Sequence, residues 1–409
     1  MFKTLAFPDN FLWGSAVSAH QTEGNNTNSD WWEWEQKGGG SKPSGIACDF
    51  YNRYKEDISL VKKLNQNAFR LSIEWAKIEP EEGKFSSKET EHYKKVLEEL
   101  KKNNIKTFVT LHHFTNPVWF TKKGGWLNPK SPQIFCNYAK YCQDNFSDLV
   151  DFWITINEPT VYAGQSYFFG LWPPQKRNVL KTAVAFINMI KTHNRCVSVL
   201  KKPAGIAHNV VRFDSATKYP WDNLLSKILN KFLADGVLFL CTKKQGFIGV
   251  NYYFQYKITN LRLSFDYSLG KTDMKWPFAP EGLYKVLINL KKYKKPLYIT
   301  ENGCADSKDA IRKLYIGCHL ESVHRAIEAG ADVKGYFHWS LMDNFEWHLG
   351  FKPRFGLIEI ERENNLKRVV RPSARYYAKV CEKNLLLSQK SNLKSQILIP
   401  QIYGLNMWL

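Results

Sequence analysis

Short apolar runs rich in β-branched and aromatic residues alternate along the chain with longer segments in which apolar residues recur at helical spacing. In residues 93–103 the apolar positions recur every three or four residues, which predicts a helix, and a second helix is predicted at 315–329. Strands that alternate with helices indicate a parallel sheet with both faces covered. Eight runs are predicted to be strands: Phe11–Ala16, Ala68–Ile73, Lys106–His112, Phe152–Asn157, Gly205–Asn209, Phe247–Tyr252, Leu297–Glu301 and Lys334–Ser340.

Polar residues at the strand ends distinguish an open doubly wound sheet from a closed barrel. A barrel brings all its strand ends to one rim, whereas an open sheet favours one switch point and a glycine-rich phosphate loop. The chain has no G-x-G-x-x-G or G-x-x-x-x-G-K-[ST] motif. Different strands spread over the whole chain end in polar groups: His112-His113, Asn157-Glu158, Asn251, Glu301-Asn302 and Trp339-Ser340. The predicted fold class is therefore α/β, a single (β/α)8 TIM barrel.

The regular pattern ends near Lys383. We expect the barrel to span residues 1–384 and residues 385–409 to form a C-terminal extension of unknown role. Two alternatives remain for this extension: it docks on the barrel, or it contacts another subunit. The sequence leaves the oligomeric state open for the same reason.

Length and composition agree with a globular protein. The chain has 409 residues, of which 44% are hydrophobic and 23% are charged, and this mixture excludes general disorder. No stretch approaches the roughly 20 uninterrupted apolar residues that a membrane span needs. The first residues lack the apolar core of a secretory signal. We therefore expect a soluble, cytoplasmic protein with no membrane partner.

A formal net charge of +20 raises the question of nucleic acid as a partner. The lysines are scattered as doublets along the whole chain, and no arm or recognition helix concentrates them, so we expect a solvated basic surface and no nucleic-acid partner. The eight cysteines show no C-x-x-C or other zinc spacing, and we expect them to be free, buried thiols. Neither a metal nor a cofactor is expected.

Two glutamates follow apolar strands, and each lies beside an asparagine. Glu158 and Glu301 are 143 residues apart, which places them on the fourth and seventh strands of a barrel, across its mouth. One glutamate at a strand end is most often part of a structural salt bridge. Two that face each other in one cavity instead suit the cleavage of a glycosidic bond, which needs an acid and a nucleophile or base.

At this point the chain resembles glycoside hydrolase family 1, the retaining β-glucosidase-like (β/α)8 barrels. The resemblance runs from Phe11 to about Asn384. Seven motifs occur in the order of the family: Phe11-Leu12-Trp13-Gly14 with His20-Gln21-Thr22-Glu23-Gly24, Arg70-Leu71-Ser72-Ile73-Glu74-Trp75, His113, Asn157-Glu158-Pro159, Asn251-Tyr252-Tyr253, Thr300-Glu301-Asn302-Gly303, and the block from Trp339 to Trp347.

The resemblance implies roles for five residues. Glu301 is expected to be the nucleophile, and Glu158 the acid that protonates the leaving oxygen and then the base that deprotonates water. Arg70 and Tyr253 match the positions that keep the nucleophile ionised. Asn157 matches the position that binds the sugar 2-hydroxyl.

The resemblance also implies a set of substrate-binding residues. A simpler interpretation stays open for three of them: Gln21 as a loop cap, His113 as a buried core histidine and Trp339 as part of the barrel core. Trp339 matches the ring that lies under the sugar. The full set is Gln21, His113, Trp339, Glu346, Trp347 and Phe355.

Three positions bear on the choice of sugar. A subgroup of the family that cleaves 6-phosphoglycosides carries Ser, Lys and Tyr where this chain has Glu346, Pro353 and Phe355. A carboxylate at position 346 also repels a phosphate. We therefore expect an unphosphorylated substrate, most simply a β-glucoside, with β-galactosides and β-fucosides as further candidates.

Two other functions remain as alternatives, a transglycosylase with the same site and a non-catalytic glycan-binding relative. The chain also departs from the family between residues 209 and 247, where it is shorter than usual. This departure affects the leaving-group side of the site, and an opened barrel is one conceivable consequence.

Overall fold

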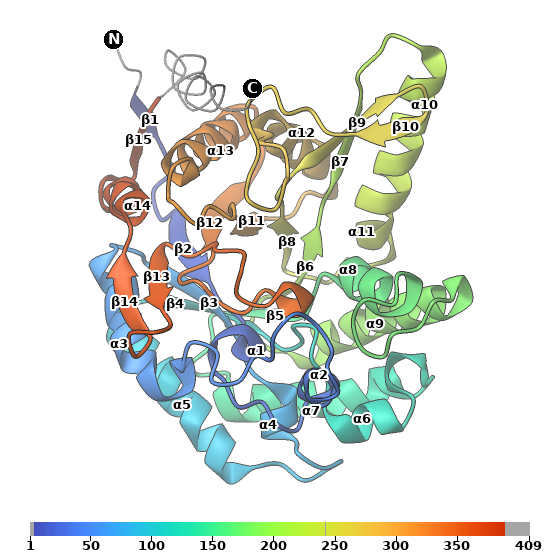
Figure 1. The fold of residues 1–409 in the computed structure, drawn as a ribbon, viewed down its shortest axis with the longest axis vertical. Helices are drawn as coiled ribbons and strands as arrows, with labels where there is room; N and C mark the ends of the chain where they lie inside the picture. The colour runs from blue at the N-terminus through green and yellow to red at the C-terminus, as the bar shows by residue number, and fades with distance from the viewer. Residues whose placement is uncertain (1–3, 242, 389–409) are drawn as a thin grey trace, which may run out of the picture.

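The computed structural model describes residues 4–241 and 243–388 and contains a closed, parallel, eight-stranded barrel (Figure 1). Helices surround the barrel on its outside. In order around the barrel the strands are β2 (Leu12–Ala16), β3 (Ala68–Ser72), β4 (Lys106–Thr110), β5 (Phe152–Asn157), β6 (Ala204–Asn209), β8 (Phe247–Asn251), β11 (Leu297–Asn302) and β12 (Val333–Trp339), which returns to β2.

All eight predicted strands are present, with ends within two residues of the prediction. The two predicted helices are α5 (Ser87–Lys102) and α13 (Arg312–Glu328). The short segment between residues 209 and 247 does not open the barrel, because β6 pairs directly with β8. The predicted TIM barrel is thus confirmed, and the possibility of an open barrel is wrong.

The outer layer consists of helices, and several of them begin with a capping residue whose side chain accepts a hydrogen bond from a free backbone amide of the first turn. Ser86 precedes α5 and its hydroxyl accepts a hydrogen bond from the Glu89 amide at 3.3 Å. The other α-helices are α1 (Ala19–Thr22), α2 (Asp30–Gln36), α3 (Phe50–Lys63), α4 (Trp75–Ile78), α6 (Val118–Lys122), α7 (Ser131–Phe146), α8 (Pro159–Ala163), α9 (Val179–Val199), α10 (Pro220–Leu229), α11 (Gly236–Leu240), α12 (Pro280–Leu290) and α14 (Pro372–Lys383).

Shorter elements make up the rest of the regular structure in the described residues. A small sheet contains β7 (Arg212–Ser215), β9 (Gln255–Thr259) and β10 (Arg262–Ser264), and β13 (Ile358–Glu361) pairs with β14 (Lys367–Val370). Two π-helical turns are η2 (Gly164–Phe168), after α8, and η3 (Asn230–Ala234), after α10. The 3-10 turns are η1 (Gly125–Leu127), η4 (Lys291–Tyr293) and η5 (Trp347–Leu349).

A layer of large side chains fills the inside of the barrel near the start of its strands. Phe108, Phe247, Tyr298 and Phe337 are at most 7% exposed and pack together there with partly buried Phe152. Because this layer fills that end of the barrel, a cavity inside the barrel can open only toward the other end, where the strands finish.

The C-terminal extension begins as part of the fold. Leu385–Leu387 forms β15, which pairs in antiparallel register with β1 (Thr4–Ala6). The rest of the predicted extension, residues 389–409, lies outside the described residues. The division at residue 384 therefore stays a prediction.

The cysteines lie as predicted: all eight are free and buried. Among residues 4–241 and 243–388, no helix is both long and apolar enough to cross a bilayer.

Candidate active site

The two predicted catalytic carboxylates lie in one cavity of about 380 Å³ at the ends of the barrel strands. Glu158 directly follows β5, and Glu301 is the next-to-last residue of β11. The carboxylates are 6% and 3% exposed, so both are buried. Seven other predicted residues line the same cavity: His113, Asn157, Tyr253, Trp339, Glu346, Trp347 and Phe355.

Glu301 is surrounded by groups that stabilise its ionised form. Arg70 lies on β3, and its Nη1 donates to Glu301 Oε1 at 2.5 Å. The hydroxyl of Tyr253 donates to Oε2 at 2.6 Å. A cation on one oxygen and a hydroxyl donor on the other favour a carboxylate anion with a fixed orientation.

Arg70 also connects the nucleophile candidate to Asn157. Its Nη2 donates to Asn157 Oδ1 at 2.7 Å, and its Nε donates to the Thr110 hydroxyl at 3.2 Å. The Arg70 side chain is fully buried, and the three nitrogens of its planar guanidinium each donate to a different side chain. The positions of Glu301 and Asn157 are therefore set by one group.

Glu158 has a different environment. Its Oε1 accepts from the amides of Asn251 at 2.7 Å and Asn209 at 3.2 Å, and no cation bonds to it within the described residues. Burial, followed by the charge of Glu301, raises the pKa of Glu158 from an ordinary 4.5 to about 8. The two amide bonds lower this pKa only in part. At neutral pH the fold thus favours a protonated Glu158.

Asn209 and Asn251 received no role in the sequence analysis. Asn209 is the last residue of β6 and Asn251 the last of β8, and the two are paired in the barrel. Asn251 Nδ2 also donates to Asn157 Oδ1 at 3.1 Å. The sequence signal that could have identified Asn209 and Asn251 was their position as polar residues at strand ends. Their common partner, Glu158, follows only from the pairing of the strands.

His113 lies between two tryptophans on the cavity wall. Its ring is nearly parallel to Trp339 (centroids 5.8 Å apart, planes at 17°) and to Trp347 (6.1 Å, 13°). Burial, with the charge of Arg70 acting in the same direction, lowers the pKa of His113 well below its usual value. Asn157 Nδ2 donates to His113 Nε2 at 3.3 Å. In this tautomer Nδ1 carries the proton, and it has no protein partner in the described part of the chain.

Glu346 offers an acceptor to the same cavity. Its Oε2 is buried and has no hydrogen-bond partner among the described residues. Burial, followed by the charges of Glu301 and Glu158, raises the pKa of Glu346 to about 8. Gln165 on η2, which the sequence analysis did not identify, also lines the cavity, and its side-chain oxygen Oε1 has no hydrogen-bond partner within ranges 4–241 and 243–388. Buried donors and acceptors without partners suit a ligand that is rich in hydroxyl groups.

Gln21 is the one predicted substrate-binding residue that the structure does not place on the cavity wall. Its side chain is fully buried and donates to the Phe345 carbonyl at 2.8 Å and to Asn344 Oδ1 at 3.2 Å, while its carbonyl accepts from the Ser18 hydroxyl. In this arrangement Gln21 supports the loop that carries Glu346. A direct contact between Gln21 and a sugar stays a prediction.

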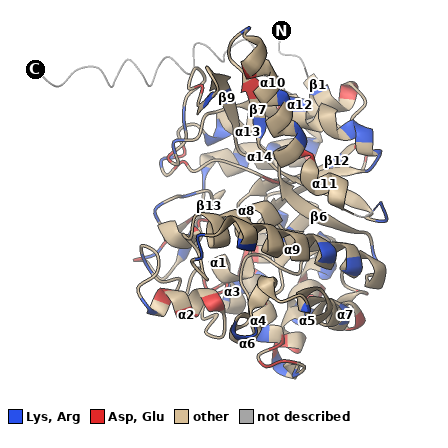
Figure 2. Ribbon diagram, turned by 90° about the vertical axis from the view of Figure 1, so that its right-hand side faces the viewer, with Lys and Arg blue, Asp and Glu red and all other residues tan. Residues whose placement is uncertain are grey.

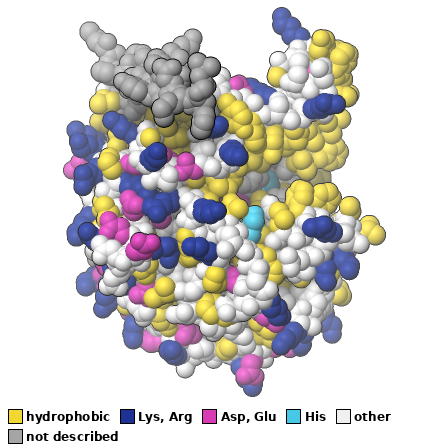
Figure 3. Space-filling view, viewed as in Figure 1, with side chains coloured by type: hydrophobic (Ala, Val, Ile, Leu, Met, Phe, Trp, Pro, Cys, Tyr) yellow, Lys and Arg dark blue, Asp and Glu magenta, His cyan; other side chains and the backbone are white. Residues whose placement is uncertain are grey.

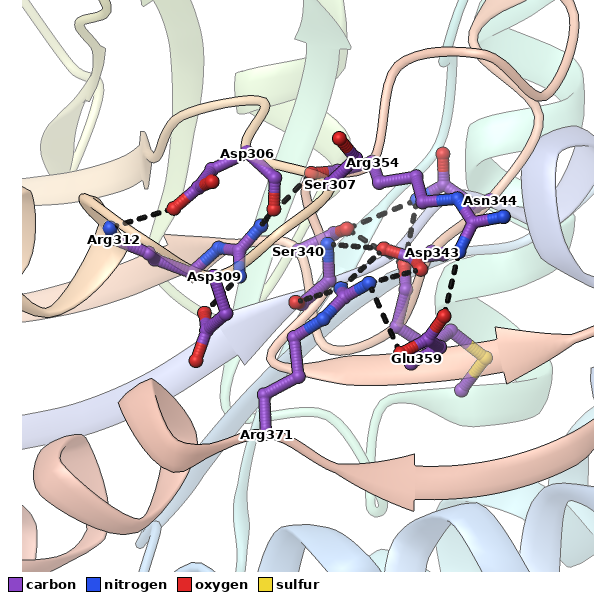
Figure 4. Close-up of polar contacts among 12 residues, drawn as sticks. Asp306, Ser307, Asp309, Arg312, Ser340, Asp343, Asn344, Arg354, Glu359 and Arg371 are labelled. Atoms are coloured by element: carbon purple, nitrogen blue, oxygen red, sulfur yellow. Dashed lines mark hydrogen bonds and ion pairs between the residues drawn. The ribbon is translucent and has the colours of Figure 1, made fainter. Parts of the chain in front are cut away.

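The loop that carries Glu346 and Trp347 is fixed by an ion pair beneath it (Figure 4). Arg371, at the start of α14, donates to both carboxylate oxygens of Asp343, at 2.8 and 2.9 Å, and to the Gly356 carbonyl at 2.8 Å. Asp343 Oδ1 in turn accepts from the Gly356 amide at 2.9 Å. Because Asp343 and Gly356 lie near the two ends of the loop, these bonds hold both ends together.

No group of three or more His, Cys, Asp or Glu side chains in the described ranges 4–241 and 243–388 is arranged to hold a metal ion.

Comparison with known proteins agrees with this geometry. The model of the family named Glycosyl hydrolase family 1 matches residues 3–233 and 239–386. The chain belongs to glycosyl hydrolase family 1. The family was predicted from the sequence motifs and the barrel from the alternating strands and helices with polar strand ends, and both predictions are confirmed. It is a glycosyl hydrolase by this membership.

Several relatives resemble almost the whole chain. A 1,4-beta-D-glucan glucohydrolase of Thermotoga neapolitana is 32% identical over 439 aligned positions, which cover 92% of this chain and 98% of the relative. A 6-phospho-beta-galactosidase of Clostridium acetobutylicum is 30% identical and covers 93% and 98%. The solved structure of a beta-glycosidase from Pyrococcus horikoshii is 35% identical, covers 98% and 100%, and has a TM-score of 0.90. These relatives act on different sugars, so the family alone does not define the substrate.

Proposed function

We propose that the protein is a retaining β-glycosidase that hydrolyses terminal, unphosphorylated β-D-glycosides, with β-glucosides as the preferred class. One observation carries this proposal: two buried carboxylates share one cavity but have opposite environments. Glu301 is paired with Arg70 and Tyr253, whereas in the described part of the chain only amides bond to the carboxyl of Glu158, and its pKa is raised to about 8. Such a difference divides the work between a nucleophile and an acid.

In the first step, an oxygen of Glu301 attacks the anomeric carbon of the sugar. The glycosidic bond breaks as this new bond forms, and the proton of Glu158 moves to the leaving oxygen. Arg70 and Tyr253 hold Glu301 ionised and oriented before the attack. We assign the amide of Asn157, which lines the cavity, to the sugar 2-hydroxyl, where a hydrogen bond strengthens as positive charge develops on the sugar.

In the second step, water attacks the anomeric carbon of the glycosyl ester. Glu158, now ionised, takes a proton from this water, and the carboxylate of Glu301 departs. The sugar is released with its original β configuration, and both glutamates return to their starting states. Because Glu158 alternates between acid and base, a raised pKa near the working pH suits both steps.

Unphosphorylated sugars are favoured by the residues on the far side of the cavity. Glu346 lies on the cavity wall, and its Oε2 has no partner among the described residues, which suits a sugar hydroxyl. The carboxyl offers a phosphate no positive charge, and its ionised form, which prevails above a pH of about 8, repels one. His113 offers the complementary donor, Nδ1, and Trp339 presents a flat ring. Donor, acceptor and ring together suit a neutral hexose.

The proposal is tested with a panel of nitrophenyl β-glycosides: glucoside, galactoside, fucoside, mannoside and 6-phosphoglucoside. We expect the glucoside to give the highest kcat/KM and the 6-phosphoglucoside to fall below it. Glu158→Gln and Glu301→Gln should each lose at least about 10³-fold in kcat. Wild-type rates in either variant, or faster cleavage of the phosphorylated glucoside, would contradict the proposal.

A further inference from the structure

One face of the molecule exposes an unusual number of apolar side chains. They gather over α9, α10 and the turns that follow α8 and α10, at the right of Figure 3. Leu180 is 77% exposed and Phe239 is 82% exposed. Contiguous exposed apolar surface of this kind marks an interaction site on a soluble protein. We call it the apolar face: Phe168, Phe169, Val179, Leu180, Val184, Ile187, Tyr219, Trp221, Leu224, Ile228, Phe232, Leu233, Phe239 and Leu240.

Two helices present these residues as ordered stripes. On α9, Leu180, Val184 and Ile187 follow one another at helical spacing, and all three are exposed. On α10, Trp221 and the two exposed residues that follow it on the same side, Leu224 and Ile228, repeat the pattern. A helix of a globular protein normally turns such a stripe toward the core, so these two faces lack the cover that their sequence calls for.

An apolar groove of about 580 Å³ lies within the face. Its walls come from α8 and η2, from α9, and from η3 and α11, so it joins the two halves of the face. Phe168, Phe186 and Phe239 are among the residues that line it. The groove can therefore hold flexible apolar chains, while the rest of the apolar face can lie against a flat surface.

The charge on this face is one-sided, and Figure 2 turns the face toward the viewer. Residues 164–202 contain seven lysines and arginines and no aspartate or glutamate. Between residues 203 and 246, the acidic side chains are Asp214, Asp222 and Asp235, and each already has protein partners: Lys285, the Thr217 hydroxyl and Lys292. The face thus offers apolar groups inside a basic surround.

This charge pattern argues against a second copy of the chain as the cover. In a symmetric dimer the same face meets itself, so the lysines around it would lie opposite lysines. Lys181, Lys191, Lys227 and Lys231 form no ion pair with an acidic side chain in the described chain, and a dimer would provide none nearby. A partner with an anionic surface and an apolar layer below it fits both the lysines and the exposed apolar side chains of the face.

We propose that the apolar face docks on an anionic lipid bilayer. Trp221 and Tyr219, which stack on each other at 4.7 Å, would lie at the level of the lipid headgroups, where these residue types are enriched. The apolar stripes of α9 and α10 enter the boundary of the acyl chains, and the surrounding lysines contact lipid phosphates. The protein lies on the membrane and does not cross it, in agreement with the lack of a spanning helix among the described residues.

This inference differs from the expectation of no membrane partner. That expectation rested on the lack of a long apolar segment, which tests only for a helix that spans the bilayer. A surface formed by exposed residues of several separate elements leaves no such signal in the sequence.

Docking would also place the catalytic cavity near the lipid. Val161 on α8 and Gln165 on η2 line the catalytic cavity, while Thr160, Ala163 and Phe168 from the same two elements line the apolar groove. One short helical segment therefore separates the two. The experiment below measures docking without use of catalysis, so its result does not depend on the proposed function.

The test measures sedimentation of the full-length protein with vesicles. One set contains phosphatidylcholine and phosphatidylglycerol in equal parts, and the other contains phosphatidylcholine alone. We expect sedimentation with the anionic vesicles, weaker sedimentation with the neutral ones, and a decrease as salt is added. Equal sedimentation with both sets, or none with the anionic set, would overturn the proposal.

Variants localise the contact. The triple variant Leu180→Glu, Trp221→Glu and Phe232→Glu should lower the partition coefficient at least about tenfold, because it places acids among the inserted side chains. Lys181→Gln and Lys191→Gln should each lower it about fivefold. Ile46→Glu, at an exposed apolar residue outside the apolar face, should leave it unchanged. Sedimentation that is unaffected by the triple variant would overturn the proposal.

Two controls separate docking from other causes. The circular dichroism melting curve of each variant should match the wild type, since all these side chains are exposed. Light scattering without lipid should show a monomer. A dimer that the triple variant dissociates would show that a second copy covers the face, and would overturn the proposal.

Discussion

Arg70 and Glu301 form a buried ion pair across the barrel, with Nη1 and Oε1 2.5 Å apart. The same guanidinium donates to Asn157, so it sets the spacing between the nucleophile candidate and the amide expected at the sugar 2-hydroxyl. One planar group can serve both partners because its donors point along fixed directions. The pair is therefore both an electrostatic and a geometric element of the site.

Arg70→Lys should keep the charge but lose this geometry. A lysine ammonium is a compact donor on a flexible stem and cannot bond Glu301 and Asn157 in the same fixed arrangement. We expect kcat/KM for a nitrophenyl β-glucoside to fall about 10²-fold, as for the loss of one preorganised donor. Arg325→Lys, at a half-exposed pair with Glu281, is the matched control and should leave kcat/KM unchanged. Wild-type kcat/KM in Arg70→Lys would show that the second bond is unimportant.

The pH dependence should report the protonation of Glu158. Its pKa is raised to about 8, and the first step requires its proton, so kcat/KM should be constant near neutrality and fall as the pH rises through about 8. A methyl glucoside needs this proton most. A dinitrophenyl glucoside leaves with little protonation, and its alkaline decrease should be much weaker.

The pH profiles of kcat/KM for the methyl and dinitrophenyl glucosides, measured side by side, show whether Glu158 controls the alkaline decrease. Identical alkaline limbs for the two substrates would mean that another group controls the decrease.

Azide should partly restore the activity of Glu158→Ala on the dinitrophenyl substrate, because the anion can occupy the space of the missing carboxylate and attack the glycosyl ester.

Asp343→Asn should destabilise the loop that carries Glu346 and Trp347. The substitution removes both short bonds between Arg371 and a carboxylate and leaves only the longer contact with Glu359, at 3.7 Å. Breaking a buried pair costs about 3 kcal/mol of unfolding free energy. We also expect KM for the β-glucoside to rise more than kcat falls, since the loop supplies sugar contacts and not the reacting carboxylates. Urea unfolding and steady-state kinetics measure the two effects.

The control for this prediction is Glu281→Gln, which breaks the exposed pair with Arg325 and should change the unfolding free energy by less than about 1 kcal/mol. An Asp343→Asn protein that is as stable as this control, with an unchanged KM, would show that the ion pair does not position the loop.

The sequence predicted the barrel strands well because each is a short apolar run that ends in polar residues. This pattern also identified Glu158 and Glu301 as strand-end carboxylates. It could not identify Asn209 and Asn251 as partners of Glu158, because that contact depends on which strands become neighbours in the closed barrel. Tertiary pairing, which is not encoded in any local period, decides such contacts.

Two other features lay beyond the sequence for different reasons. Gln21 belongs to a motif, but its side chain bonds to Asn344 and the Phe345 backbone, and the motif does not define side-chain direction. Leu180 on α9 and Trp221 on α10 each belong to an apolar stripe at helical spacing, and such a stripe predicts a face that is buried in the core. Whether another element packs over them depends on the tertiary arrangement, so their exposure appeared only in the structure.

The most direct test of the central claim is to trap the glycosyl enzyme. A 2-deoxy-2-fluoro-β-glucoside with a dinitrophenyl leaving group forms the ester readily but hydrolyses slowly, because fluorine destabilises positive charge on the sugar. Mass spectrometry of the peptides then locates the label. The account predicts one fluoroglucosyl group per chain, on Glu301. A label on another residue, or turnover with no label and an inverted α product, would contradict it.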